Sequence, residues 1–230
     1  MQPCADAIRT MFDGIADRYD RINDLMTFTR HRAWKRDLVR AVGARPGDVA
    51  LDLCTGTGDI AALLAETVIP AGRVTAIDFS PEMLRIARSR HGGPIDWQEG
   101  DALALPFPDA TFDVATVGFG LRNVVGLDPA IAEVFRVLRP GGRFGSLDLS
   151  KPAGPVVAAG ARFYSTVVVG ALARLAGADP EPYRYLPRSN RTFPDSRHLA
   201  ARFAAAGFEA VTCSDRGMGA VALVWGRKPS

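Results

Sequence analysis

The sequence has little of several features that would assign it to a class at once. Its 230 residues include only three cysteines, Cys4, Cys54 and Cys213, and these are unevenly spaced. They form neither a disulfide framework nor a metal-ligand pattern, so we expect no bound metal and a reducing compartment. The net charge of +3 is too small to predict nucleic-acid binding, and we expect no nucleic-acid partner.

Long apolar runs are also lacking. The most apolar stretch, residues 153–178, is interrupted by Arg162 and Arg174. The segment between these arginines falls well short of the roughly 20 residues needed to cross a bilayer, so we expect no transmembrane helix. The first residues include Asp6 and Asp13 and lack a basic region followed by an apolar run, which argues against a secretory signal. We therefore expect a cytoplasmic protein.

The chain does contain a regular alternation of short apolar strands and amphipathic helices. Strands are expected over 49–53, 73–77, 95–98, 112–117, 143–148, 209–213 and 220–225. Helices are expected over 5–20, 31–42, 60–68, 131–138, 153–178 and 199–206, with a further one begun by Pro81 after the cap Ser80. A polar turn at Asn23–Asp24 would join the first two helices. This order predicts an α/β protein with a Rossmann-like, doubly wound, seven-stranded and mostly parallel sheet.

One domain, residues 1–230, accounts for the whole chain. Residues 1–46 would form an N-terminal helical cap on the substrate side, and residues 47–150 would form the cofactor-binding core. Residues 151–194 are expected to be a helical lid inserted after the fifth strand, and residues 195–230 supply the final helix and strands.

A glycine loop follows the first expected strand, where ligands bind in doubly wound sheets. Gly56 and Gly58 let a ligand approach the backbone, and their spacing also fits a dinucleotide site. Asp52 and Asp59 flank the loop and would repel a pyrophosphate at the N-terminus of the next helix. S-adenosylmethionine has no phosphate and carries a sulfonium and an ammonium group. The loop therefore favours S-adenosylmethionine as the cofactor.

The next strand ends supply more acids. Asp78 follows the second strand and is placed to accept both ribose hydroxyls, and Asp101–Ala102 follows the third, near the adenine amino group. Phe79 and Leu103 are expected to sandwich the purine. Each acid alone would be equally consistent with a helix cap or a surface turn, but their placement at consecutive strand ends favours a cofactor site.

Longer motifs carry a resemblance to known families. The stretches LDLCTGTGD (51–59), AIDFS (76–80), EGDALALPFPDATFD (99–113) and RVLRPGGR (136–143) resemble class I S-adenosylmethionine methyltransferases. The narrower motifs YDRIND (19–24), HRAWK (31–35), GFGLRNV (118–124) and YRYLP (183–187) resemble the C-methyltransferases of ubiquinone and menaquinone biosynthesis. The resemblance runs from about residue 8 to residue 228.

This resemblance implies C-methylation of a prenylated quinol, with conversion of demethylmenaquinol to menaquinol favoured. The alternatives are 2-methoxy-6-polyprenyl-1,4-benzoquinol as the acceptor, or another aromatic small molecule. A nucleotide-dependent oxidoreductase and a non-catalytic lipid-binding subunit are more distant options. The family's cofactor contacts fall on Thr57, Asp78, Asp101 and Ala102, and Gly118 stands where the family usually has a serine. The residues predicted to bind the cofactor are Asp52, Gly56, Thr57, Gly58, Asp78, Phe79, Asp101, Ala102 and Gly118.

Three residues are predicted to act in catalysis. Arg122 would stabilise the phenolate of the acceptor, and Asn123 would orient the same oxygen. A structural salt bridge from Arg122 to an acid remains the alternative, with Asp20, Asp24 and Asp128 as candidates. His31 is the best side chain for a general base, and a packing or capping role is the alternative. The residues predicted to bind the acceptor are Tyr19, Asn23, Asp24, Trp34 and Tyr164, and a core role is the alternative for Tyr19 and Trp34.

The acceptor would be a membrane lipid, so contact with the bilayer is expected. Residues 151–191 hold an excess of basic residues around an apolar helix, which suits the anionic inner face of a membrane. A lid packed on the sheet, with its arginines solvated, is the alternative. The sequence leaves the oligomeric state open, a homodimer included.

Overall fold

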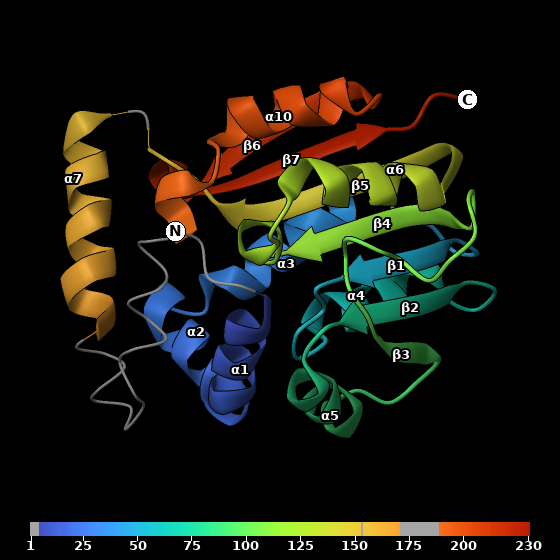
Figure 1. The fold of residues 1–230 in the computed structure, drawn as a ribbon, viewed down its shortest axis with the longest axis horizontal. Helices are drawn as coiled ribbons and strands as arrows, with labels where there is room; N and C mark the ends of the chain where they lie inside the picture. Colours follow the sequence, from blue (N-terminus) through green and yellow to red (C-terminus); the bar gives the residue numbers. More distant parts are fainter. Residues whose placement is uncertain (1–4, 153, 171–188) are drawn as a thin grey trace.

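A seven-stranded sheet forms the centre of the computed structural model, which describes residues 5–152, 154–170 and 189–230. The strand order is β3-β2-β1-β4-β5-β7-β6 (Figure 1). Neighbours are parallel from β3 through to β5, and β7 is antiparallel to both β5 and β6. The strands are β1 (Val49–Leu53), β2 (Arg73–Asp78), β3 (Ile95–Glu99), β4 (Phe112–Gly118), β5 (Leu138–Leu149), β6 (Glu209–Arg216) and β7 (Val221–Arg227). The predicted Rossmann-like fold is confirmed.

Helices cover the two faces of the sheet and form separate apolar cores. On one face lie α3 (Arg30–Ala41) and α4 (Asp59–Val68), whose buried side chains include Leu38 and Leu64. On the other lie α6 (Leu127–Val137) and α10 (Ser196–Ala205). There the ring of Phe203 stacks on that of Phe144 with 4.7 Å between the centroids. Strands β1 and β4 are buried on both sides, as central parallel strands should be.

Helix α5 (Pro81–Arg90) begins as the sequence predicts. The Ser80 hydroxyl accepts a hydrogen bond from the Met83 N–H at 3.1 Å, and Pro81 occupies the first turn, where its missing N–H costs nothing. Ser80 therefore starts α5 almost directly after the end of β2.

The N-terminal cap differs from the sequence prediction in the position of its turn. Its helices are α1 (Ala5–Ile15), the short 3-10 helix η1 (Ala16–Arg18) and α2 (Tyr19–Thr27), so the expected turn at Asn23–Asp24 lies inside α2. The chain instead reverses at Phe28 and Thr29, whose φ angles are 49° and 62°. The side chain of Asp24 is engaged by His31 and Arg32 of α3, so a local turn preference is outweighed by contacts made across the bend.

Charged and polar pairs join the cap to α5. Three aspartates of the cap, one or two helical turns apart, each meet a donor on α5 or at its start. The pairs are Asp13–Ser80 (2.5 Å), Asp17–Arg85 (2.9 Å) and Asp20–Arg90. A small apolar cluster of Ala16, Met83 and Ile86 lies beside them. The cap is therefore held over the ends of β2 and β3.

Two further boundaries differ from the sequence prediction. Strand β5 begins at Leu138 instead of residue 143, because Leu138 pairs with Phe112 and the expected turn at Pro140–Gly142 is a bulge in which Gly141 has a φ of 75°. The expected helix 153–178 is seen as α7 (Pro155–Phe163) followed by the π-helical turn η3 (Tyr164–Val168). Its later part, 171–178, and much of the predicted lid lie outside the described residues.

Figure 1 shows α7 at one edge of the molecule, away from the sheet. Within the ranges that the structure describes, we find no helix with the length and apolar character that spanning a bilayer requires.

Candidate functional site

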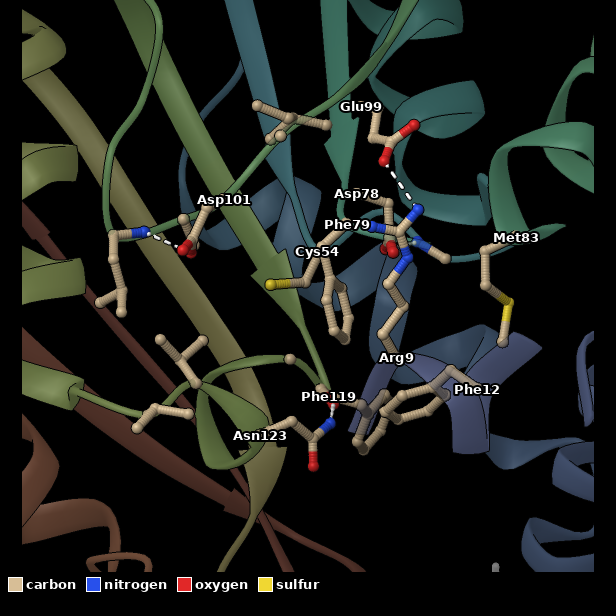
Figure 2. A pocket seen from close by; sticks show the side chains of 18 of the residues that line it. Arg9, Phe12, Cys54, Asp78, Phe79, Met83, Glu99, Asp101, Phe119 and Asn123 are labelled. Atoms are coloured by element: carbon tan, nitrogen blue, oxygen red, sulfur yellow. Dashed lines mark hydrogen bonds and ion pairs between the residues drawn. The ribbon is translucent and has the colours of Figure 1, made fainter. Parts of the chain in front are cut away.

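A cavity of about 320 Å³ opens at the carboxyl ends of β1, β2, β3 and β4 and is closed from one side by α1 and α2 (Figure 2). The crossover connections of a doubly wound sheet bring these strand ends together. The predicted cofactor residues Gly56, Asp78, Phe79, Asp101, Ala102 and Gly118 line this cavity, together with the acceptor candidate Tyr19 and the predicted catalytic residue Asn123. The unpredicted lining residues include Asp6, Arg9, Phe12, Cys54, Met83, Glu99 and Phe119.

The carboxylate of Asp78 organises the floor of the cavity. Its Oδ2 accepts from the main-chain N–H of Gly56 at 2.7 Å, and its Oδ1 accepts from the N–H of Ser80 at 3.0 Å. The first bond needs the left-handed backbone of Gly56, whose φ is 55°. Burial raises the pKa of Asp78 to about 6, although the backbone hydrogen bonds favour the ionised form. A carboxylate held in this way can accept from the two hydroxyls of a ribose.

The base-binding side is built on the chain after β3. Asp101 accepts from the N–H of Leu103 at 2.9 Å, which fixes the turn that carries Ala102. Leu103 and Phe79 both line the cavity. An adenine fits this side because it has two apolar faces and an amino group that a carboxylate can accept from.

The cap closes the cavity with an aromatic group and one ion pair. The ring of Phe12 stands edge-to-face against Phe79, with 6.4 Å between the centroids, and against Tyr19 at 6.2 Å. Arg9 reaches Glu99 at 2.9 Å, as Figure 2 shows. These contacts make residues of α1 and α2 part of the wall.

The charge of the lining favours a cation. Among the residues that the structure describes, four carboxylates line the cavity, those of Asp6, Asp78, Glu99 and Asp101, against the one guanidinium of Arg9. A diphosphate would meet this excess negative charge at short range, whereas a sulfonium and an ammonium would be stabilised by it. The residues present therefore fit S-adenosylmethionine.

The two acids that flank the glycine loop, Asp52 and Asp59, are not among the residues that line the cavity. Asp52 is 1% exposed, and its two oxygens accept from the hydroxyls of Thr55 and Thr116. Asp59 is bound by Lys35 at 2.7 Å, which compensates its charge. The negative charge of the cavity comes instead from the predicted acids Asp78 and Asp101, together with Glu99 at the end of β3 and Asp6 of the cap.

Two more predicted cofactor residues, Thr57 and Gly58, belong to the glycine loop but do not line the cavity. The hydroxyl of Thr57 is buried and donates to Asp20 of the cap at 2.8 Å. Gly58 has a φ of 88°, and a Cβ there would lie 2.5 Å from the ring of Trp97. Both residues therefore hold the loop in place against α2 and β3.

Gly118 lines the cavity through its backbone. A Cβ at this position would overlap the terminal methyl group of Ile60, so the serine that the resembled family usually carries would require the Ile60 side chain to move. Gly120 is equally constrained, because a Cβ there would overlap the side chain of Cys54.

The predicted base lies outside the lining. His31 is 3% exposed, and its Nε2 lies 2.9 Å from an oxygen of Asp24, which Arg32 also binds. Burial lowers the pKa of His31, and the hydrogen bond to Asp24 opposes this. A neutral imidazole at pH 7 is the result.

The remaining acceptor candidates make structural contacts outside the cavity lining. The carbonyl of Asn23 accepts from the Thr27 hydroxyl at 2.7 Å. Trp34 packs against the core beneath α3, with its ring near Gly217. The hydroxyl of Tyr164 donates to the carbonyl of Met26 at 2.7 Å and so ties η3 to α2.

Arg122 and Asn123 stand in the short 3-10 helix η2 (Leu121–Asn123) after β4. Asn123 lines the cavity and donates to the carbonyl of Phe119 at 3.2 Å. Arg122 is 7% exposed and forms a salt bridge with Asp148 at 2.7 Å. The partner is therefore an acid at the end of β5, not one of the three suggested by the sequence. A guanidinium already compensated by a carboxylate stabilises a second anion less well.

Solved structures with the same fold include the [4+2]-cyclase SpnF, with a TM-score of 0.72 and 19% identity over 100% of this chain and 97% of that one. A possible histamine N-methyltransferase from Thermotoga maritima gives a TM-score of 0.70 at 19% identity, over 96% and 99%. This fold, together with an acidic strand-end cavity that fits S-adenosylmethionine, is that of the class I S-adenosylmethionine-dependent methyltransferases.

The sequence also matches the ubiE/COQ5 methyltransferase family over residues 2–228, and the chain belongs to that family. Similar proteins are the ubiquinone/menaquinone biosynthesis C-methyltransferases of Rubrivivax gelatinosus and Hydrogenovibrio crunogenus. The first is 43% identical over 92% of this chain and 83% of that protein, and the second is 40% identical over 96% and 89%.

Sequence reasoning missed several residues of the site. Asp148 obeys the same strand-end rule that identified Asp78 and Asp101, so the signal was present. Glu99, the last residue of β3, obeys the rule as well. Its ion pair with Arg9 carries no comparable signal, because nothing in the local pattern pairs two residues that far apart in the chain.

The raised pKa of Asp78 predicts how cofactor binding depends on pH. The ribose hydroxyls donate to the ionised carboxylate, so the affinity for S-adenosylhomocysteine should fall as the pH drops below about 6. Asp78→Asn should weaken binding about tenfold or more at pH 7.5 and remove this dependence. Isothermal titration calorimetry between pH 5 and pH 8 measures both effects.

Asp52→Asn is the matched control. Asp52 is equally buried, and burial likewise raises its pKa to about 6, but it lies outside the lining. Its replacement should leave the affinity near that of the wild type and keep the pH dependence. If Asp52→Asn removed the pH dependence and Asp78→Asn did not, the assignment of Asp78 to the ribose would be wrong.

Proposed function

We propose that this protein transfers a methyl group to a ring carbon of a prenylated quinol, with demethylmenaquinol as the favoured acceptor. The proposal rests on the part of the cavity wall that carries no acidic side chain. There Tyr19, Phe119, Val124 and Val125 provide aromatic and apolar surface beside the amide of Asn123. A quinol ring has the same character, since it is flat and apolar with hydroxyl groups at its edge. The names of the family's similar proteins support this acceptor class.

When bound, S-adenosylmethionine supplies an electrophilic methyl group on a sulfonium. The residues of this chain would then orient the acceptor and exclude water. We assign the orientation of the phenolic oxygen to Asn123, whose side chain is held at the cavity by Phe119. The cap, through Phe12 and Tyr19, would keep water from the reacting carbon.

Loss of the phenolic proton is the remaining requirement. His31 stays our candidate for the base, because its lowered pKa keeps the ring neutral and able to accept a proton at pH 7. Its ring is covered by the cap and hydrogen-bonded to Asp24, so proton transfer would need a water or a small shift of α2. Arg122 contributes in this scheme by supporting Asn123 rather than by contacting the phenolate.

Label transfer tests the acceptor. The protein is incubated with methyl-labelled S-adenosylmethionine and, separately, with reduced demethylmenaquinol or 2-methoxy-6-polyprenyl-1,4-benzoquinol. We expect demethylmenaquinol to gain the label in its ring. Label in the benzoquinol alone would move the function to ubiquinone biosynthesis, and label in neither would contradict the proposal and favour another aromatic acceptor.

We also propose that the protein acts in the cytoplasm, at the inner face of the membrane that holds its acceptor. Helix α7 and η3 present a stripe of exposed apolar side chains at helical spacing, with Val156 83%, Phe163 61% and Val167 52% exposed. Phe28, two residues after the Met26 that Tyr164 contacts, is 74% exposed. Exposed basic residues, Lys151 and Arg162, accompany this stripe and would favour anionic lipid.

Sedimentation with anionic liposomes tests the membrane contact. Binding that falls with rising salt is expected, and Phe163→Glu should weaken it several-fold by placing a charge in the apolar stripe. Ile69→Glu is the control, because Ile69 is 48% exposed but lies at the end of α4. Equal effects of the two substitutions, or no sedimentation of the wild type, would count against contact through α7. Dimer formation stays a prediction, and light scattering of the protein without liposomes tests it.

A further inference from the structure

The turn after β4 has an unusual backbone. Phe119 is in the left-handed region with a φ of 58°, a conformation that non-glycine residues adopt only when their surroundings impose it. Its N–H donates to the carbonyl of Leu147 at 2.6 Å. Its carbonyl accepts from the side chains of both Arg122, at 2.5 Å, and Asn123. Figure 2 shows Phe119 and Asn123 side by side at the cavity.

Asp148 at the end of β5 is the carboxylate around which this turn folds. It is 1% exposed. One oxygen accepts from the main-chain N–H of Arg122 at 3.2 Å, and the other accepts from the guanidinium of Arg122 at 2.7 Å and from the N–H of Leu149. The two oxygens therefore hold Arg122 by its backbone and by its side chain at once.

A continuous set of bonds results, from the carboxylate of Asp148 through the guanidinium of Arg122 to the carbonyl of Phe119 and the amide of Asn123. Asp148 and Arg122 are both buried and lie outside the cavity lining, whereas Phe119 and Asn123 line it. Charge-assisted hydrogen bonds of this kind are strong and directional in a buried setting. Two cavity residues are thus bonded, through Arg122, to a carboxylate that lies outside the cavity lining.

We propose that Asp148 is a positioning residue for methyl transfer, which acts through Arg122 to fix Phe119 and Asn123 at the acceptor side of the cavity. The inference rests on the proposed function for the identity of the acceptor. It assigns Arg122 to the same positioning network and leaves Asn123 as the residue that contacts the substrate. The cofactor side, built on Asp78 and Asp101, is independent of this network.

Asp148→Asn tests the proposal, because it removes the charge and replaces one accepting oxygen by a donor. The cofactor side is untouched, so the dissociation constant for S-adenosylhomocysteine should stay within about threefold of the wild type. The value of kcat with saturating S-adenosylmethionine and quinol should fall about ten- to hundredfold, since a shift of the turn misaligns the acceptor. A role in overall folding alone would not separate these two quantities.

Hydrogen exchange followed by mass spectrometry gives a readout that needs no turnover. In Asp148→Asn, the peptide covering residues 118–124 should exchange faster, while the peptide covering residues 49–59 should exchange as in the wild type. Ser146→Ala is the matched control. Ser146 is a buried polar residue on the same strand, 0% exposed, and has no bond to the turn in the described structure. This variant should change neither exchange nor kcat.

If Asp148→Asn does not fold, Asp148→Glu keeps the charge and displaces the carboxylate by one methylene, and the same separation of kcat from cofactor affinity is expected at a smaller size. Unchanged exchange over residues 118–124, or a loss of S-adenosylhomocysteine binding as large as the loss of kcat, would overturn the proposal. A kcat within twofold of the wild type despite faster exchange would overturn it too. A wild type that labels neither quinol would instead contradict the proposed function, because exchange and cofactor binding do not require the acceptor.

Discussion

The hydrogen bond from the Gly56 N–H to the buried carboxylate of Asp78 is the contact on which the site depends. It joins the loop after β1 to the end of β2 and holds the loop in its left-handed conformation. The cost of burying Asp78 appears as its raised pKa. Such a cost is typical of a site that is organised before its ligand arrives and in which ligand groups complete the hydrogen bonding.

The cap is coupled to this loop through Thr57, which was predicted to bind the cofactor, and through Asp59. Asp20 accepts from Thr57 and pairs with Arg90, while Lys35 binds Asp59 at the first turn of α4. The loop acids and hydroxyls thus hold α2 and α3 against the core. The same contacts hold the cap in place, and its residues Phe12 and Tyr19 line the cavity.

Two acids at strand ends therefore play different parts. Asp78 lines the cavity and is proposed to bind the ribose of the cofactor, whereas Asp148 is buried and bonds to the turn that carries Asn123. Both follow from the parallel topology, which gathers the carboxyl ends of the strands at one edge. The rule that locates acids at this edge does not decide between the two roles, because that depends on whether a basic side chain such as Arg122 is folded onto the carboxylate.

The sequence predicts the strands well because buried parallel strands are short apolar runs, and topology then places Asp78 and Asp101 correctly. Local preference failed at Asn23–Asp24, where contacts of Asp24 across the bend outweigh the turn tendency. Arg122 was placed in the correct turn, but its partner lies on β5. Pairings such as Arg9 with Glu99 exist only once the cap is packed, so no local pattern could reveal them.

Calorimetric titration of the wild-type protein with S-adenosylmethionine and with NAD tests the central claim, that an acidic strand-end cavity selects a cationic cofactor. We expect S-adenosylmethionine to saturate one site and NAD, with its pyrophosphate, to give no binding heat at the same concentrations. Binding of NAD with comparable affinity, or its displacement of S-adenosylmethionine, would contradict it.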